Sequence, residues 1–460
     1  MRRQRLAKER RSSSSSSNAA AQVTEEDMED LFSDVEIQKM RVSLLAWYGL
    51  NRRDLPWRVS LPEANDEDDV EKRAYRVWVS EVMLQQTRVQ TVVDYFNRWM
   101  LKWPTLLHLS TASLEEVNEM WAGLGYYRRA RYLLEGAKMI VSEGGQFPRT
   151  VSSLRKVPGV GEYTAGAIAS IAFKEAVPVV DGNVVRVIAR LKAISANPKD
   201  SATIKKFWEL AAQLVDPSNP GDFNQGLMEL GATICTPLSP TCSSCPVSDQ
   251  CRAVSISRRD RSVLVTDYPS KGMKMKQRHD FSAVCVLEVL KGEEDMSDSE
   301  FLLVKRPDEG LLAGLWEFPS VLLDGEADVD NRREAMNRYL KAHFQIETRK
   351  AGKVMLREYV GEFVHVFSHI RLRIYVEYMV LHLKGGMKMK GAFRKRDTET
   401  PPWKYVGNDV ISSMGLTSSV RKVYTMVEKF KQQKIASSNP PVPSRKRNPR
   451  SNKKGTTTTN

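Results

Sequence analysis

The sequence predicts a multidomain protein in which an all-α domain is followed by an α+β domain, with a disordered tail at each end. Apolar residues recur at helical spacing through residues 37–234, whereas from Asp280 onward β-branched and aromatic residues gather in short segments. The chain has 460 residues, 41% of them apolar, which is enough for two cores. The expected parts are an N-terminal tail at 1–35, a helical domain at 36–253, a linker at 254–279, an α+β domain at 280–431 and a C-terminal tail at 432–460.

The charge is concentrated at the two ends of the chain. A net charge of +14 and a pI near 9.4 favour a polyanionic partner. Residues 1–12 carry six basic side chains and one acidic one, and residues 444–454 carry six basic ones, which leaves about +3 for everything between. The net charge of the segment between the tails therefore does not by itself indicate a basic binding groove, and only local motifs can.

The two tails hold the candidate signals for the cellular location of the protein. No run of about 18 apolar residues is present, so no membrane span is expected. Segment 1–21 is basic and Ser-rich without the apolar region of a secretory signal; a nuclear signal, an organelle transit peptide and a solvated tail stay open. Segment 444–450 resembles a nuclear signal, with a solvated tail as the alternative. We expect a monomer in the nucleus, with a mitochondrial pool as the alternative.

The first helices carry a carboxylate in an apolar setting. Helical periodicity runs over 37–49, and one long helix is predicted over 75–100. Within it Glu81 lies between Val79 and Val82, an expensive place for a charge. Two interpretations stay open: a salt-bridged helix residue, or a buried acid with a raised pKa.

Residues 115–139 form another helical region, interrupted at 123–129 by Gly-Leu-Gly-Tyr-Tyr-Arg-Arg. Glycines, paired tyrosines and arginines suit an edge that stacks on bases and binds phosphates. A helix corner with core tyrosines is the alternative.

The segment 151–190 combines a tight turn with two helix starts. Gly159 and Gly161 let the backbone approach a partner, and the helix 162–173 begins directly afterwards, so its first N–H groups can bind an anion. This arrangement is typical of a helix-hairpin-helix that holds a DNA phosphate, although an αα-corner fits as well. Asp181 precedes Gly-Asn-Val and is a helix N-cap candidate.

Four cysteines then lie within 17 residues, with the spacing Cys-x6-Cys-x2-Cys-x5-Cys. Such a set can close around one metal centre, and zinc and [4Fe–4S] are both candidates. The ligands would be Cys235, Cys242, Cys245 and Cys251.

In the second half of the chain the spacing of apolar residues changes. Residues 253–279 show no clear periodicity and read as a linker. Further helices are expected at 204–215, 223–234, 330–343 and within 410–430, and strands at 281–289, 301–305, 362–367 and 370–382.

Taken together these motifs resemble the MutY-type adenine DNA glycosylases of the endonuclease III superfamily. The resemblance is close over 36–253 and looser over 280–430, which is similar to the Nudix-like C-terminal domain of that family. It implies duplex DNA containing adenine opposite 8-oxoguanine as substrate, and it makes the cysteine set a [4Fe–4S] site. It also implies that the linker and tails are available to repair or replication proteins. The motifs, in order, are Leu-Pro-Trp-Arg (55–58), Val-Ser-Glu-Val-Met-Leu-Gln-Gln-Thr (79–87), Trp-Ala-Gly-Leu-Gly-Tyr-Tyr (121–127), Val-Pro-Gly-Val-Gly-Glu-Tyr-Thr-Ala (157–165) and Val-Val-Asp-Gly-Asn-Val (179–184).

The resemblance assigns roles that fit the chemistry of base excision. A purine leaves more readily when protonated, and the sugar left behind has oxocarbenium character. Glu81 matches the acid that protonates the flipped adenine, and Asp181 the carboxylate that stabilises the cation or transiently bonds the sugar. The other matched residues are Tyr163 and Asn183, which support this pair, Arg58, which contacts the adenine, Gln86 and Tyr126, which enter the base stack, and Gly159 and Gly161 of the hairpin.

Position 163 separates two classes of enzyme. Bifunctional relatives carry a Lys there that forms a Schiff base, which a Tyr cannot do. A monofunctional glycosylase is therefore expected. The alternatives are a bifunctional glycosylase/lyase and a catalytically inactive DNA-binding scaffold; intact Glu81 and Asp181 argue against the latter.

The C-terminal domain departs from Nudix hydrolases. Segment 302–319 looks like the start of a Nudix fold, but Asn337 and Arg338 stand where two metal-binding glutamates would be, so pyrophosphatase activity is not expected. Phe367, Ser368 and His369 match the loop that recognises 8-oxoguanine; a strand-end turn with a core Phe is the alternative. Cys285 is the one cysteine outside the cluster, so no additional zinc site is expected.

Overall fold

The structure, a computed structural model, describes residues 31–58, 67–270, 276–290, 299–346, 354–382 and 401–438. Most of the predicted tails and part of the linker lie outside these ranges. The chain divides into two compact units. Where described, the first comprises Met1–Trp78, Phe147–Lys156 and Val160–Gly272, and the second Val79–Gln146, Val157–Gly159 and Met273–Asn460. No helix among the described residues is long and apolar enough to cross a membrane.

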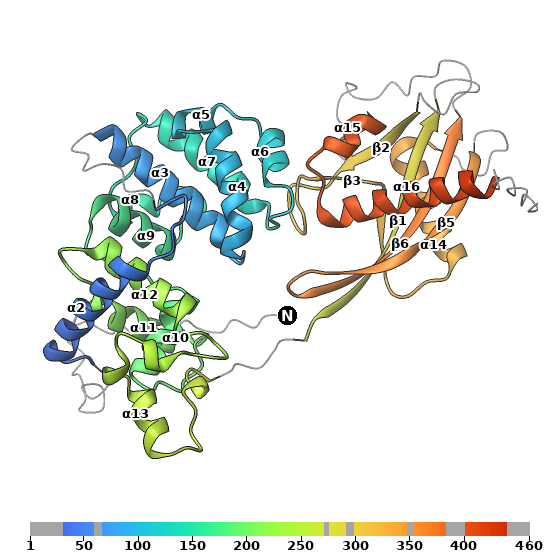
Figure 1. The fold of residues 1–460 in the computed structure, drawn as a ribbon. Coiled ribbons are helices and arrows are strands. Elements are labelled where there is room, and N and C mark those ends of the chain that lie inside the picture. The colour runs from blue at the N-terminus through green and yellow to red at the C-terminus, as the bar shows by residue number, and fades with distance from the viewer. Residues whose placement is uncertain are drawn as a thin grey trace, which may run out of the picture. The chain divides into compact units, whose positions relative to one another are not determined.

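The predicted order of a helical part followed by an α+β part is confirmed (Figure 1). The helices up to the start of the sheet are α2 (Asp34–Asn51), α3 (Glu67–Leu84), α4 (Val89–Lys102), α5 (Leu106–Ser110), α6 (Leu114–Trp121), α7 (Arg128–Ser142), α8 (Val151–Leu154), α9 (Glu162–Phe173), α10 (Gly182–Leu191), α11 (Ser201–Leu214), α12 (Pro220–Thr233) and α13 (Arg252–Arg259).

Two sequence predictions are wrong in this part. The single helix expected over 75–100 is two helices, α3 and α4, because Gln86 adopts a left-handed backbone with φ of 57° that no helix can contain. The segment expected to be an irregular linker begins with the two-turn helix α13, which buries Ala253 and Val254.

The core of the first unit forms around α12, which packs against α2, α9 and α10. Two glycines of α12 permit this close approach. A Cβ on Gly226 would lie 3.2 Å from the Cβ of Tyr48 in α2, and one on Gly231 would lie 2.6 Å from the Cβ of Asn183 in α10. Small residues on α12 thus bring the start of α10 against its flank.

The C-terminal part is built on one seven-stranded sheet among the described residues. Its main path runs β3-β2-β1-β6-β5; β4 also pairs with β1 and β7 with β2. Strands β1 and β6 are parallel, and the other pairs are antiparallel. The elements are β1 (Arg278–Leu290), β2 (Ser299–Lys305), β3 (Trp316–Glu317), β4 (Ser320–Leu323), α14 (Val329–Phe344), β5 (Val354–Val366), β6 (Ile370–His382), β7 (Trp403–Gly407), α15 (Asn408–Ser413) and α16 (Ser418–Ser438).

Helices cover both faces of this sheet, which explains why β1 and β6 read as nearly continuous apolar runs. In β1, Val284 and Val286 face a core that includes residues of α15 and α16, whereas Cys285 and Leu287 face a core that includes residues of α14. Alternation of exposed and buried residues is therefore limited to the first residues of β6. The short strands β3, β4 and β7 were not predicted, because their alternation spans too few residues to give a signal.

Candidate active site

Asp181 caps the N-terminus of α10, as predicted. Its Oδ1 accepts hydrogen bonds from the backbone N–H groups of Asn183 (2.9 Å) and Val184 (2.7 Å), and its Oδ2 accepts one from Nδ2 of Asn183 (2.7 Å). Burial raises the pKa of this carboxyl group, against the opposing effect of its hydrogen bonds. The result is a largely buried acid whose two oxygens are both fixed in position.

A chain of hydrogen bonds continues from Asp181 to the cysteine segment. Oδ1 of Asn183 accepts from Nη2 of Arg186 at 2.8 Å, and Nε of Arg186 donates to the carbonyl of Cys235 at 2.8 Å. The same Nη2 also donates to the carbonyl of Gly231 at 2.7 Å. Arg186 thus joins α10, the end of α12 and the first cysteine.

One turn further along α10, Arg190 binds the cysteine segment again. This arginine is only 2% exposed, and its Nη1 lies 3.2 Å from Sγ of Cys235 and 2.8 Å from the carbonyl of Thr236. Burial raises the pKa of Cys245 to about 12, and the three neighbouring thiols act in the same direction. The cysteines therefore lie near one another, but no group of three or more His, Cys, Asp or Glu side chains in the described ranges is arranged to hold a metal ion.

Arg58 lies in an ionic cluster that the sequence did not reveal. Its Nη2 donates to Oε2 of Glu229 at 2.9 Å, and Arg53 donates to Glu229 through Nε (2.6 Å), Nη2 (2.8 Å) and its backbone N–H (3.1 Å). Glu229 is 1% exposed, yet these two arginines lower its pKa to about 2 against the opposing effect of burial. Its only sequence signal is a carboxylate between Met228 and Leu230, the same signal that singled out Glu81.

Two polar atoms beside this cluster have no hydrogen-bond partner in the described part of the chain. They are Nε of Arg58 and the hydroxyl of Tyr48, both buried. The guanidinium of Arg58 lies 5.6 Å from the centre of the Tyr48 ring. Buried polar groups are nearly always paired in native proteins, so unpaired ones beside a pre-ordered ion cluster favour a place for a polar ligand.

Tyr163 and Glu81 lie in different surroundings. The Tyr163 hydroxyl donates to Sδ of Met228 at 3.5 Å, so this α9 residue contacts the residue directly before Glu229. Glu81 lies on α3 and is 6% exposed, a buried acid as the apolar spacing indicated. It belongs to the second compact unit, whereas Asp181, Tyr163 and Arg58 belong to the first.

The hairpin turn uses its two glycines differently. Gly159 has φ of 75°, and a Cβ there would lie 2.6 Å from Cβ of Tyr132, so only glycine fits. Gly161 is the N-cap of α9 with φ of −88° and open space where a Cβ would be. The backbone of Gly161 is therefore open to any residue, and its lack of a side chain leaves the first N–H groups of α9 uncovered by a Cβ.

Gln86 and Tyr126 share an uncommon backbone. Both are non-glycine residues with positive φ, 57° and 48° respectively. Tyr126 is 47% exposed, whereas its neighbour Tyr127 is 7% exposed and belongs to the core. Tyr127 is therefore a core residue, as the helix-corner interpretation expected, whereas the Tyr126 ring faces solvent.

Phe367, Ser368 and His369 form the connection between β5 and β6, closed by a hydrogen bond from the Phe367 N–H to the Ile370 carbonyl at 2.8 Å. Ser368 and His369 are exposed, with Ser368 Oγ 3.3 Å from Nδ1 of His369. Phe367 is half-buried and packs edge-on against His365, with ring centres 4.6 Å apart. The Phe thus lies at the rim and outside the core, so the turn presents three side chains together.

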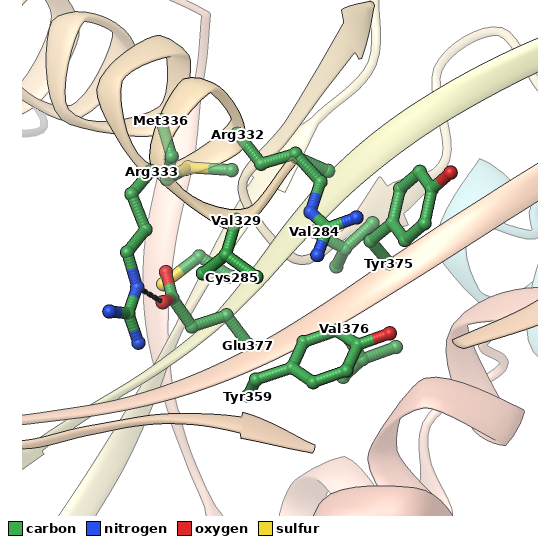
Figure 2. A pocket seen from close by; sticks show the side chains of 11 residues that line it. Val284, Cys285, Val329, Arg332, Arg333, Met336, Tyr359, Tyr375, Val376 and Glu377 are labelled. Carbon is green, nitrogen blue, oxygen red and sulfur yellow. Dashed lines mark hydrogen bonds and ion pairs between the residues drawn. The ribbon is translucent and has the colours of Figure 1, made fainter. Parts of the chain in front are cut away.

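The Nudix-type helix position is occupied by an ion network. Asn337 accepts from Nη1 of Arg357 at 2.6 Å, and Arg357 and Arg333 both pair with Glu377, at 2.7 and 2.6 Å. Arg338 is exposed. Figure 2 shows the Arg333–Glu377 pair at one side of a small pocket. Cationic side chains therefore fill the surroundings of Asn337. The pocket is lined by Ala283, Val284, Cys285, Val329, Arg332, Arg333, Met336, Tyr359, Tyr375, Val376 and Glu377.

Comparison with known proteins agrees with this architecture. Residues 79–213 match the HhH-GPD superfamily of base excision DNA repair proteins, and residues 296–426 match the NUDIX domain. An adenine DNA glycosylase of Arabidopsis thaliana is 60% identical over 418 residues, which cover 86% of this chain and 65% of that protein. Adenine DNA glycosylases of Mus musculus and Homo sapiens are 42% and 43% identical over 439 residues, covering 87% and 86% of this chain and 80% and 76% of theirs.

The chain belongs to the adenine DNA glycosylase family, with a helical HhH-GPD part followed by a Nudix-like part. It spans just under two thirds of the length of the Arabidopsis relative, at 65%.

Proposed function

We propose that this protein hydrolyses the N-glycosidic bond of adenine mispaired with 8-oxoguanine in duplex DNA, without cleaving the strand. The observation that carries the proposal is the Asp181 carboxylate, held on both oxygens at the start of α10. When the bonding electron pair leaves with adenine, the sugar becomes cationic, and a fixed anion stabilises that charge without having to reorganise. Water then completes the hydrolysis at the sugar carbon.

Glu81 supplies the proton. Glu81 lies on α3 at 6% exposure, and a carboxylic acid there can act as the general acid that donates a proton to a ring nitrogen of the leaving base. The base must leave the helix stack before this happens. Gln86 and Tyr126, which stand on loops with positive φ, enter the base stack near the lesion base.

Arg58 contacts the flipped base, and Glu229 holds Arg58 in place. Glu229 stays ionised, with a pKa of about 2, and its two oxygens accept four hydrogen bonds from Arg53 and Arg58. The buried, unpaired Nε of Arg58 and hydroxyl of Tyr48 support a ligand at this place.

Tyr163 supports a monofunctional reaction. Its phenol donates a hydrogen bond to Met228 and has no amine with which to form an imine with the sugar. The Phe367–His369 turn reads the 8-oxoguanine: a hydroxyl and an imidazole can distinguish its N7–H and C8=O edge from that of guanine. The arginines around Asn337 oppose a divalent cation, in keeping with a reading domain rather than a hydrolase.

The cysteine set fits a [4Fe–4S] cluster in its donor chemistry. Four thiols border one apolar cluster, and Arg190 points a guanidinium N–H at Sγ of Cys235, as suits a thiolate. Cys235, Cys242, Cys245 and Cys251 would hold it. When bound, the iron–sulfur group would cross-link the cysteine segment. Arg186 and Arg190 of α10 already bind this segment through the carbonyls of Cys235 and Thr236.

The test uses a duplex carrying a single adenine opposite 8-oxoguanine, incubated with the protein and split into two portions. Hot alkali should reveal strand breaks at the adenine position, whereas the untreated portion should stay intact and borohydride should trap no covalent complex. Breakage without alkali, together with borohydride trapping, would instead favour a glycosylase/lyase. The protein used must show the absorbance of an intact iron–sulfur group at about 400 nm. If such protein releases no adenine, it is a DNA-binding scaffold and not a glycosylase. The predicted nuclear location rests on tail residues outside the described ranges and stays a prediction.

A further inference from the structure

The guanidinium of Arg129 lies at the junction of two loops. Arg129 is on α7, and its Nη1 donates to the carbonyls of Val82 (2.8 Å), Met83 (3.2 Å) and Gln85 (2.6 Å) at the C-terminal end of α3. Its Nη2 donates to the carbonyls of Leu124 (3.3 Å) and Gly125 (3.2 Å) in the α6–α7 loop. One planar group thus binds the end of a helix and a separate loop at the same time.

No carboxylate within the described ranges neutralises this charge; its partners are backbone carbonyls, the hydroxyl of Thr87 and two aromatic rings. Burial consequently lowers the pKa of Arg129 to about 10. The carbonyls at the end of α3 carry the negative end of the helix dipole and compensate the cation. A guanidinium is therefore stable here only while both chain segments keep their carbonyls in place.

The carbonyls that Arg129 binds directly precede the two residues with strained backbones. Gln85 precedes Gln86, whose φ is 57°, and Gly125 precedes Tyr126, whose φ is 48°. Such conformations persist in non-glycine residues only when the surrounding structure enforces them. The guanidinium also lies 5.6 Å from the centre of the Tyr126 ring, and the Arg129 N–H donates to the Tyr126 carbonyl at 2.9 Å.

We propose that Arg129 is a positioning residue that fixes Gln86 and Tyr126 as one rigid pair for entry into the DNA base stack. The proposal rests on the function proposed above, in which these two side chains occupy the duplex around the flipped adenine. Lysine cannot take this role, because a single ammonium cannot hold two segments with a planar fork.

The first test is a double-mutant cycle. Arg129→Lys is combined with Gln86→Ala plus Tyr126→Ala, and single-turnover adenine excision is measured on the duplex with adenine opposite 8-oxoguanine. If Arg129 acts through the pair, Arg129→Lys alone slows excision about 10- to 100-fold, but less than about threefold in the background that lacks both side chains. Arg131→Lys, a half-exposed arginine paired with Glu135 on the same helix, is the matched control and should change little. If Arg129→Lys slows excision by the same factor in the wild type and in the background that lacks both side chains, the proposal is overturned.

The second test does not depend on catalysis. Hydrogen exchange of the segments 84–88 and 121–127 is compared between wild type, Arg129→Lys and Arg131→Lys at a temperature where all three are folded. If Arg129 holds both segments, exchange rises in both of them in Arg129→Lys and in neither of them in Arg131→Lys. A rise in one segment or in neither overturns the proposal, even if the wild-type protein excises no adenine; in that case the proposed function fails separately.

Discussion

Replacement of Glu229 by Gln tests the ion cluster at the predicted adenine pocket. The change keeps the shape of the side chain and removes the charge that Arg53 and Arg58 compensate. The pKa of Glu229 falls from 4.5 to about 2, a difference that corresponds to about 3 kcal/mol of interaction with the ionised form. Because Arg53 is 38% exposed, solvent screens part of this interaction, and we expect a loss of about 2 kcal/mol at pH 7.

The pH dependence has a definite sign. Since the folded-state pKa of Glu229 lies below its unfolded value, the stabilisation is present above about pH 5 and is lost as the pH falls toward 2. Urea denaturation at several pH values between 7 and 3 measures it. The free energy of unfolding of the wild type should exceed that of Glu229→Gln at pH 7, and the difference should shrink as the pH falls. Glu135→Gln, which removes an exposed ion pair, should have the same free energy of unfolding as the wild type at every pH. Equal unfolding free energies at pH 7, or parallel profiles, would refute the reasoning.

Three further changes probe other parts of the account. Tyr163→Lys places an amine beside Met228 and should introduce borohydride-trappable complexes that the wild type lacks; no trapping with intact DNA binding would mean that position 163 does not face the sugar. His369→Ala should reduce the preference for adenine opposite 8-oxoguanine over adenine opposite guanine by about tenfold, measured as a ratio of excision rates; an unchanged ratio would remove the turn from lesion reading. Lys431→Met leaves the buried Glu288 carboxylate, which also binds Ser299 and Tyr378, without its cation and should destabilise the Nudix-like part by about 2–3 kcal/mol in thermal unfolding; an unchanged transition would contradict the assigned ion pair.

The sequence was sufficient where function depends on local pattern. The N-cap at Asp181, the turn glycine at Gly159 and the burial of Glu81 follow from a few neighbouring residues. The change of period near Asp280 likewise predicted the second fold class. Local chemistry dominates these features, so no tertiary information was required to find them.

What the sequence could not show depends on long-range packing. Glu229 meets Arg58 across 171 positions, and neither residue alone indicates the pair. The break between α3 and α4 at Gln86 lies where Arg129, more than 40 positions away, binds the Gln85 carbonyl, whereas the local sequence favours a continuous helix. In the sheet, the cover of helices on both faces removed the alternation that strand prediction relies on.

In the proposed function, a buried acid at Glu81 protonates adenine so that the base leaves. The most direct measurement is the amount of free adenine released in a single turnover by wild type and by Glu81→Gln, with binding of the same duplex measured in parallel. Glutamine keeps the shape of the side chain but carries no transferable proton. We therefore expect Glu81→Gln to bind the duplex about as tightly as the wild type and to release adenine at least about a thousandfold more slowly. Adenine release by Glu81→Gln at a substantial fraction of the wild-type rate would contradict it.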